Sequence, residues 1–271
     1  MGRPSSVDFL ILLAPFEEEP TTQLFLEAAR RLKIVIRLSL PGDSTSKKNP
    51  GAPVLPRIGL RNPDESLARL EAMEAGGSIP LNPSRSIRVA KRKESLQELP
   101  QLGIGRPASA IWMPGAPPPL PFPFVAKRST GARGEGVTLV RGAGEWESLT
   151  PQSPGPLVIE EFFPPSARRE WRILVLGGHA IASTERFPAP GEFRANRARG
   201  GTETAGIPDR RFVALAERTA IAWNLGLTAI DLIEPAGRPP VVVDVNDTPG
   251  LAGISETLNR DLASEVLEGW P

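Results

Sequence analysis

The stretch that decides the fold is Val241-Val-Val-Asp-Val-Asn-Asp-Thr-Pro-Gly250, read together with Thr228-Ala-Ile-Asp-Leu-Ile-Glu234 shortly before it. Both stretches contain the β-branched and apolar residues that are typical of strands. Between them lies Pro235-Ala-Gly-Arg-Pro-Pro240, whose prolines and glycine favour a turn. The sequence therefore predicts two antiparallel strands joined as a β-hairpin.

The predicted hairpin brings three oxygen-bearing side chains together. If its turn is centred on Gly237-Arg238, Asp231 lies opposite Asp244. Asn246 shares a face with Asp244, because strand residues two apart point the same way. Buried carboxylates are costly without a counter-ion, and carboxylate and amide oxygens suit Mg²⁺ or Mn²⁺. An edge hairpin with solvated acids is the alternative interpretation.

The chain has 271 residues, enough for a sizeable core and more than one packed unit. It is 40% hydrophobic and 23% charged, with a net charge of +1, so no overall field favours nucleic acid or a membrane surface. Cysteine is absent, which excludes disulfides and thiolate catalysis and is compatible with a cytoplasmic protein. The early apolar run at 9–14 is too short to span a bilayer, and we interpret it as the first buried strand.

The first 80 residues or so alternate strand and helix, a pattern that predicts a small parallel sheet covered by helices. We expect strands at 7–14 and 34–38 and a helix from about Thr21. A second helix is expected after Asn62-Pro-Asp-Glu65, which offers an N-cap and a proline at the first helical position, and it should end at Gly76-Gly77.

The rest of the sequence predicts a basic helix at 85–99, a strand–loop–strand unit at 124–140 and a strand at 156–163. Two further strands are expected around Gly177-Gly178, and a helix at 209–224 precedes the hairpin. Together these elements predict a mixed α/β protein.

A glycine-rich loop, Gly131-Ala-Arg-Gly-Glu-Gly136, follows Lys127 at the end of a predicted strand. Glycines let backbone N–H groups approach phosphate oxygens closely, and a lysine supplies a point charge for them. The loop is neither a Walker motif nor a Rossmann fingerprint, because a strand follows it. A plain turn is the competing interpretation.

Arginine is concentrated between residues 166 and 200, where seven arginines and three glutamates occur. Arginine suits bidentate binding of carboxylates or phosphates, and Arg172, Arg186 and Arg194 are the stronger candidates because apolar or glycine-rich residues surround them. A solvated loop is the alternative. The single histidine, His179, is expected in an exposed turn, so no nucleophilic triad is predicted.

In combination and order, these segments resemble the ATP-grasp superfamily, and specifically the RimK-type carboxylate–amine ligases that include the α-glutamate ligases. The resemblance covers most of the chain and is sharpest from 157 to 253. It implies an ATP-grasp fold with an N-terminal pre-ATP-grasp α/β domain at 1–82, a small subdomain with a glycine-rich flap at 83–158, and a C-terminal antiparallel-sheet catalytic subdomain at 159–271.

The resemblance also implies roles for individual residues. The implied nucleotide-binding residues are Lys93, Lys127, Gly131, Gly134, Gly136, Glu161, Phe162 and Glu170. The implied substrate and acyl-phosphate contacts are Arg172, Arg186, Arg194 and Asn196. The implied ligands of two Mg²⁺ or Mn²⁺ ions are Asp231, Asp244 and Asn246. Glu161 and Phe162 resemble the adenine hinge, and Glu170 stands where the family has its ribose-binding acid.

The chain departs from the family pattern at several positions. Asp244 replaces the usual Glu, which shortens the ligand by one methylene, and Arg92 precedes Lys93 where an acid is usual. Segments 103–124 and 141–156 are shorter than usual, which implies a trimmed small subdomain.

The function implied is ATP-dependent formation of an amide or peptide bond through an acyl-phosphate, with release of ADP and phosphate. The partners implied are a small-molecule or peptide carboxylate and an amine acceptor, which is an amino acid, a peptide or a protein tail. Nucleic acid and membrane are not expected, a homo-oligomer is compatible with the resemblance, and a cytoplasmic location is expected. The alternative is an ATP-binding regulatory or interaction module that has lost ligation, which the substitution at Asp244 and the trimmed subdomain motivate.

Overall fold

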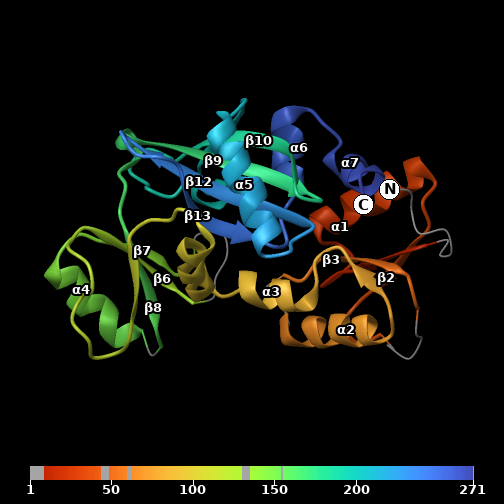
Figure 1. Cartoon of the computed structure of the whole chain (residues 1–271), viewed down its shortest axis with the longest axis horizontal. Helices are drawn as coiled ribbons and strands as arrows, with labels where there is room; N and C mark the ends of the chain where they lie inside the picture. The colour runs from red at the N-terminus through yellow and green to blue at the C-terminus, as the bar shows by residue number, and fades with distance from the viewer. Residues whose placement is uncertain (1–8, 44–48, 60–62, 130–134, 154, 271) are drawn as a thin grey trace.

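The computed structural model of the chain describes residues 9–43, 49–59, 63–129, 135–153 and 155–270, which form three sheets (Figure 1). The first sheet is parallel, with the order β2-β1-β3-β4. Its strands and helices are β1 (Leu10–Leu13), α1 (Pro20–Leu32), β2 (Ile36–Ser39), β3 (Pro53–Pro56), α2 (Pro63–Ala75), β4 (Ile79–Pro80) and α3 (Ser84–Ala90).

Helix α1 shows how the local sequence fixes this unit. The Glu19 carboxylate accepts the Thr22 N–H at 2.6 Å, Pro20 occupies the first turn, and Lys33 ends the helix in the left-handed conformation at φ 56°. The face that carries Phe25 and Ala28 is buried in the core that the first sheet shares with the C-terminal helices. The predicted alternation of strands and helices is therefore confirmed.

The second sheet is antiparallel, with the order β5-β8-β6-β7. Its elements are η1 (a 3₁₀ segment, Lys93–Leu102), β5 (Ser109–Trp112), β6 (Phe124–Arg128), β7 (Val137–Val140), α4 (Ala143–Leu149), η2 (Thr150–Gln152) and β8 (Leu157–Glu161). Its small core is aromatic, because Trp146 of α4 packs edge-on against Trp112 and Phe124 at 5.0 and 5.4 Å between ring centroids.

The third sheet has five antiparallel strands in the order β11-β10-β9-β12-β13. Its elements are η3 (Pro165–Ala167), β9 (Arg168–Leu176), β10 (His179–Phe187), η4 (Arg197–Arg199), β11 (Thr202–Ala205), α5 (Arg210–Ala222), β12 (Leu227–Pro235), β13 (Val241–Asn246), α6 (Ala252–Leu258) and α7 (Leu262–Glu268). In Figure 1, α5 crosses one face of this sheet, and α6 and α7 lie near α1.

Strand β9 explains why the third sheet has a charged region. Successive side chains alternate between its faces. Trp171, Ile173 and Val175 are buried in the core that contains Phe212 of α5. On the other face, Leu174 and Leu176 pack in the core shared with α1 and α7, whereas Glu170 and Arg172 line a cleft.

The side chain of Asn82 joins the first sheet to the third. Its Nδ2 donates to the carbonyl oxygens of Leu227 and Asp247 at 2.7 and 2.8 Å, and its Oδ1 accepts the Leu227 N–H at 2.8 Å. Leu227 begins β12 and Asp247 directly follows β13. One buried amide thus contacts both strands of the hairpin at the end remote from its turn.

The predicted hairpin is confirmed, with Asp231 paired to Asp244 and Ala229 paired to Asn246. A register shift after Asp231 means that the predicted alignment fails for the pairs next to the turn, where Leu232 pairs with Val242. A bulge absorbs the extra residue without moving the two acids apart.

The single basic helix predicted at 85–99 is wrong. Helix α3 ends at Ala90, Arg92 is extended (φ −103°, ψ 115°), and the 3₁₀ segment η1 starts at Lys93. The break frees the Lys93 N–H from the helix, and this N–H donates to the Ser129 carbonyl at 3.0 Å.

The three-part domain division stays a prediction, and β8 crosses its boundary at 158. His179 is exposed, as expected, and begins β10 directly after Gly177-Gly178. Within the described ranges, no helix combines the length and the apolar character that crossing a membrane requires.

Candidate active site

A cleft of about 900 Å³ is lined by strand residues of the second and third sheets and by residues that follow the strands of the first sheet. The first sheet and α1 contribute a wall around Glu19 and Arg57, and the second sheet contributes Lys127 and Val137. The floor is the charged face of the third sheet. Most of the residues predicted for the site line this cleft: Lys93, Lys127, Glu161, Phe162, Glu170, Arg172, Arg186, Arg194, Asn196, Asp231, Asp244 and Asn246.

Asp231 lies at the centre of a bidentate ion pair. Because β9 neighbours β12, Arg172 pairs in register with Asp231, and its Nε and Nη2 each donate to the carboxylate at 2.7 Å. Arg186 of β10 adds a third contact at 3.3 Å. Burial disfavours the charge of Arg172, but Asp231 raises the pKa of Arg172 above its ordinary value. Arg172 is therefore charged beside Asp231.

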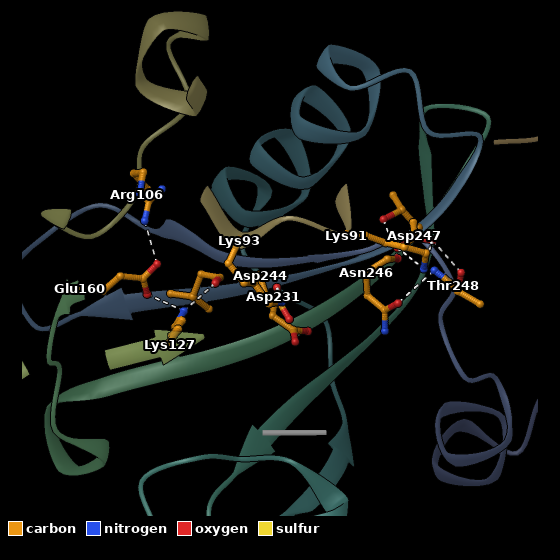
Figure 2. A network of polar contacts seen from close by, with 12 residues as sticks. Lys91, Lys93, Arg106, Lys127, Glu160, Asp231, Asp244, Asn246, Asp247 and Thr248 are labelled. Carbon is orange, nitrogen blue, oxygen red and sulfur yellow. Dashed lines mark hydrogen bonds and ion pairs between the residues drawn. The ribbon is translucent and has the colours of Figure 1, made fainter. Parts of the chain in front are cut away.

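Asp244, directly opposite Asp231, forms an ion pair with the ammonium of Lys93 (Figure 2). Burial on its own would raise the pKa of Asp244, but the charges of Lys93 and Lys127 hold it below its usual value. Burial would lower the pKa of Lys93, and Asp244 raises it instead. The pair is ionised at neutral pH.

Asn246, the third predicted metal ligand, lies farther along β13, beside Asp247 and Thr248 (Figure 2). Its Oδ1 accepts the Thr248 N–H at 3.0 Å, which leaves a second lone pair on that oxygen. Within the described ranges, no group of three or more His, Cys, Asp or Glu side chains could hold a metal ion. The donor set of two carboxylates and one amide oxygen nevertheless fits Mg²⁺, which binds few protein groups and keeps waters.

Lys127 is held by a buried acid that the sequence analysis did not single out. The Glu160 carboxylate contacts Lys127 at 2.5 Å and accepts from Arg106 at 2.7 Å, and it is 2% exposed. Lys127 also donates to the Val243 carbonyl of β13 at 3.1 Å (Figure 2). The signal for Glu160 was its place in the apolar strand 157–161, where an acid needs a cationic partner.

The expected nucleoside end of the cleft is built from β8, β9 and the loop before η4. Glu161 pairs with Arg238 at 2.7 Å, and the Phe162 ring meets the Phe193 ring edge-on at 6.0 Å. Glu170 is half-buried, and its partial removal from water raises its pKa although the charges of Arg168 and Arg186 oppose the shift.

Two of the predicted loop glycines, Gly131 and Gly134, lie outside the described residues. Gly136 is described and adopts φ 67°, and its carbonyl accepts the Arg128 N–H at 2.9 Å. This glycine thus closes the β6–β7 ladder in a conformation that side chains disfavour.

Arg194 connects its loop to the β6–β7 hairpin. Its Nη1 donates to the Val137 carbonyl at 2.9 Å, and its Nε and Nη2 contact Glu192 at 3.0 and 2.6 Å. Hydrogen bonds from Arg194 lower the pKa of Glu192 to about 2. Asn196 is half-buried on the cleft wall and directly precedes η4.

Comparison with known proteins identifies the family. The family profile of the RimK-like ATP-grasp domain matches residues 114–269. A protein of Pseudomonas savastanoi pv. phaseolicola, named probable alpha-L-glutamate ligase, is 33% identical over 229 residues, which cover 79% of this chain and 74% of that protein. The chain belongs to the RimK-like ATP-grasp family. The resemblance stated from the sequence is thereby confirmed, and this RimK-like chain is an ATP-grasp ligase.

Solved structures agree with the ATP-grasp fold. A RimK domain ATP-grasp protein of Sphaerobacter thermophilus superposes with a TM-score of 0.73 at 20% identity, covering 96% of this chain and 98% of that one. The ATP-grasp ligase PsnB, in complex with a precursor variant, Mg and ADP, gives 0.74 at 15% identity over 97% of both chains. ATP and Mg²⁺ are the cofactors of the family.

The N-terminal wall of the RimK-like cleft contains charged residues that were not predicted as site residues. Arg57 is buried, donates to the Pro249 carbonyl at 2.7 Å and contacts Glu19 at 3.2 Å. Lys91 pairs with Asp247 at 3.1 Å. The only sequence signal was an arginine directly after a short apolar strand, because these partners are distant in the chain.

Proposed function

We propose that this ATP-grasp ligase joins a carboxylate to an amine through an acyl-phosphate and releases ADP and phosphate. One observation supports this above all: Asp231 and Asp244 lie opposite each other on the cleft floor, and Lys93 contacts one of them. Lys127 reaches the same strand from the second sheet. Two acids and two lysines in one cleft are what a metal-bound triphosphate requires.

In this proposal the adenine lies at Glu161 and Phe162 and the ribose at Glu170, while Lys93 and Lys127 bind phosphate oxygens. Asp231, Asp244 and Asn246 would hold Mg²⁺, which neutralises phosphate charge when it is bound. Two ions, and Mn²⁺ in place of Mg²⁺, belong to the same proposal. Gly131, Gly134 and Gly136 would bring backbone N–H groups over the phosphates.

The chemistry then needs positioning and charge neutralisation rather than a protein nucleophile. A substrate carboxylate oxygen attacks the γ-phosphorus, the bond to the β,γ-bridging oxygen breaks, and ADP leaves. The amine nitrogen attacks the acyl carbon and loses a proton, and phosphate leaves with that carboxylate oxygen. Arg172, Arg186, Arg194 and Asn196 would surround the reacting groups, and one such contact contributes about 3–4 kcal/mol to lowering the barrier.

The relatives guide the choice of substrates. Curated relatives named probable alpha-L-glutamate ligases favour L-glutamate as one reactant, and the PsnB complexes with precursor favour a peptide as the other. We therefore propose addition of an amino acid, L-glutamate first, to a carboxylate on a small molecule, a peptide or a protein tail.

The test is isotope transfer. We would screen amino acids and dipeptides for phosphate release with Mg²⁺-ATP, and repeat each hit with ¹⁸O in the carboxylate. One ¹⁸O per phosphate released is expected, because the carboxylate oxygen leaves with the phosphate. Phosphate release without ¹⁸O transfer would contradict the acyl-phosphate.

Substitutions inside and outside the cleft test whether the activity belongs to this site. Asp231→Asn and Lys127→Ala should each lose turnover, while Arg141→Ala, at an exposed residue that does not line the cleft, should keep it. Nucleotide binding with no turnover across the whole panel would favour the regulatory module instead.

A further inference from the structure

Arg168 is a buried arginine that none of the proposed steps uses. It begins β9, lines the cleft, and its side chain is 7% exposed. Its Nη1 donates to the Phe163 carbonyl at 2.5 Å, and its Nη2 donates to the Phe193 carbonyl at 2.6 Å. The same Nη2 contacts a carboxylate oxygen of Glu170 at 3.0 Å. One guanidinium thus joins three separate segments of the wall.

Glu170 is the only charged partner of Arg168 among the described residues. The ion pair takes Oε2 of Glu170, and Oε1 has no hydrogen-bond partner in the described part of the chain. This oxygen is not fully enclosed, and Glu170 lines the cleft. A carboxylate that is paired with a guanidinium and has one free oxygen on a cleft wall is an acceptor for ligand hydroxyl groups.

The other two contacts of Arg168 fix the aromatic part of the wall. Phe163 directly follows Phe162, whose ring meets the Phe193 ring edge-on at 6.0 Å. By binding the carbonyls of Phe163 and Phe193, Arg168 sets the spacing of the two chain segments that carry these rings. Apolar rings beside one oriented carboxylate suit a base joined to a sugar.

We propose that Arg168 is a positioning residue that orients Glu170 and the two aromatic segments, and thereby makes the cleft select ribonucleotides over nucleotides that lack the ribose hydroxyls. The inference rests on the proposed nucleotide site. Arg168 acts through Glu170 and the two carbonyls, because its Nη1 and Nη2 donate to these three groups.

The experiment compares the binding of ADP and 2′,3′-dideoxy-ADP by calorimetry, with Mg²⁺ present and without turnover. The wild-type protein should prefer ADP by about 10-fold or more, because hydrogen bonds to a charged acceptor are lost in the analogue. In Arg168→Met this preference should fall to near 1, because the binding of ADP weakens more than the binding of the analogue. Arg168→Lys keeps a charge for Glu170 but cannot bind both carbonyls, and an intermediate preference is expected.

The matched control is Arg169→Met, the next residue along the strand, whose exposed side chain pairs with Glu185. It should keep the wild-type preference. An unchanged preference in both Arg168 variants would overturn the inference, as would a wild-type protein that binds the two nucleotides equally. If Arg168→Met does not fold, the preference of Arg168→Lys for ADP over the analogue tests the inference. A folded wild-type protein that binds neither nucleotide would overturn the proposed nucleotide site and this inference with it.

Discussion

Two hairpins face each other across the cleft, and they are built differently. In β12–β13 nearly every residue of β12 is buried, β9 pairs along its whole length, and its acids have cationic partners from β9 and η1. In β6–β7 the inner strand is buried at its start and exposed at Arg128, and β7 is an edge strand. Both hairpins end their sheets in an edge strand, β13 or β7, so the difference between them is burial: the charges of the site lie on the more enclosed hairpin, where neighbouring residues fix each side chain.

The largest effect is expected for Asp231→Asn, which removes a charge from the enclosed β12–β13 hairpin. We expect turnover to fall about 10²- to 10³-fold, because a charge that the phosphates and metal require is removed. We also expect a loss of about 3–5 kcal/mol in unfolding free energy, since Arg172 loses its buried counter-ion and Arg186 loses one of its two. Phosphate release and urea denaturation measure the two effects. Asp209→Asn, an exposed cap that asparagine can replace, is the control and should change neither.

The matching test of the covering hairpin is Gly136→Ala. At φ 67° a side chain costs about 1–2 kcal/mol, and the added Cβ would lie 3.2 Å from the Arg128 side chain. Turnover should fall several-fold, with a smaller loss of global stability than in Asp231→Asn, because β7 is an edge strand. Gly144→Ala on α4, where the new methyl meets open space, should leave turnover unchanged. Equal losses of stability in Gly136→Ala and Asp231→Asn would contradict the distinction between the hairpins.

A metal titration sharpens the comparison, because Lys93 forms an ion pair with Asp244, one of the proposed metal ligands. In Lys93→Met we expect the nucleotide-free protein to bind Mn²⁺ several-fold more tightly, since the competing cation is gone. Electron paramagnetic resonance of free Mn²⁺ measures the affinity. Lys33→Met, at the end of α1, should not alter it. Weaker binding in Lys93→Met would show that Lys93 and the metal do not share Asp244.

The smallest effect concerns Arg194, which connects the loop before η4 to the β6–β7 hairpin. Glu192 has a pKa of about 2 in the folded protein against about 4.3 when unfolded. Its contribution is therefore present above pH 4.3 and is lost as the pH falls toward 2. The stability difference between the wild type and Glu192→Gln should be constant from pH 7 to 5 and shrink below pH 4.3. A difference that grows on acidification would contradict the Arg194–Glu192 pair.

Local sequence patterns predicted most of the helices and strands, but they did not predict which distant strands pair with each other. Alternating apolar residues and the turn between 235 and 240 were enough to place Asp231 opposite Asp244. Nothing in the sequence says that β9 flanks β12, so the ion pair of Arg172 with Asp231 could not be predicted. The break after α3 was not predicted either, because the hydrogen bond from the Lys93 N–H to the Ser129 carbonyl forms only in the folded chain.

The same distinction holds for the site residues, some of which the sequence predicted and some of which it did not. The family resemblance named Lys93 and Lys127 for the phosphates, and both line the cleft. The acid that holds Lys127, Glu160, and the arginine that orients Glu170 became visible only through contacts between distant strands. The sequence shows which residues lie on one strand and share a face. The partner of a buried charge depends on the order of the strands in the sheet, which the sequence does not show.

The three hydrogen bonds of Asn82 have a consequence for domain motion. They tie the first sheet to the β12–β13 hairpin, so these two parts should travel as a single rigid body. In the proposed function, entry of ATP and release of ADP would then require a hinge elsewhere, and the β5-β8-β6-β7 sheet is the part expected to rotate.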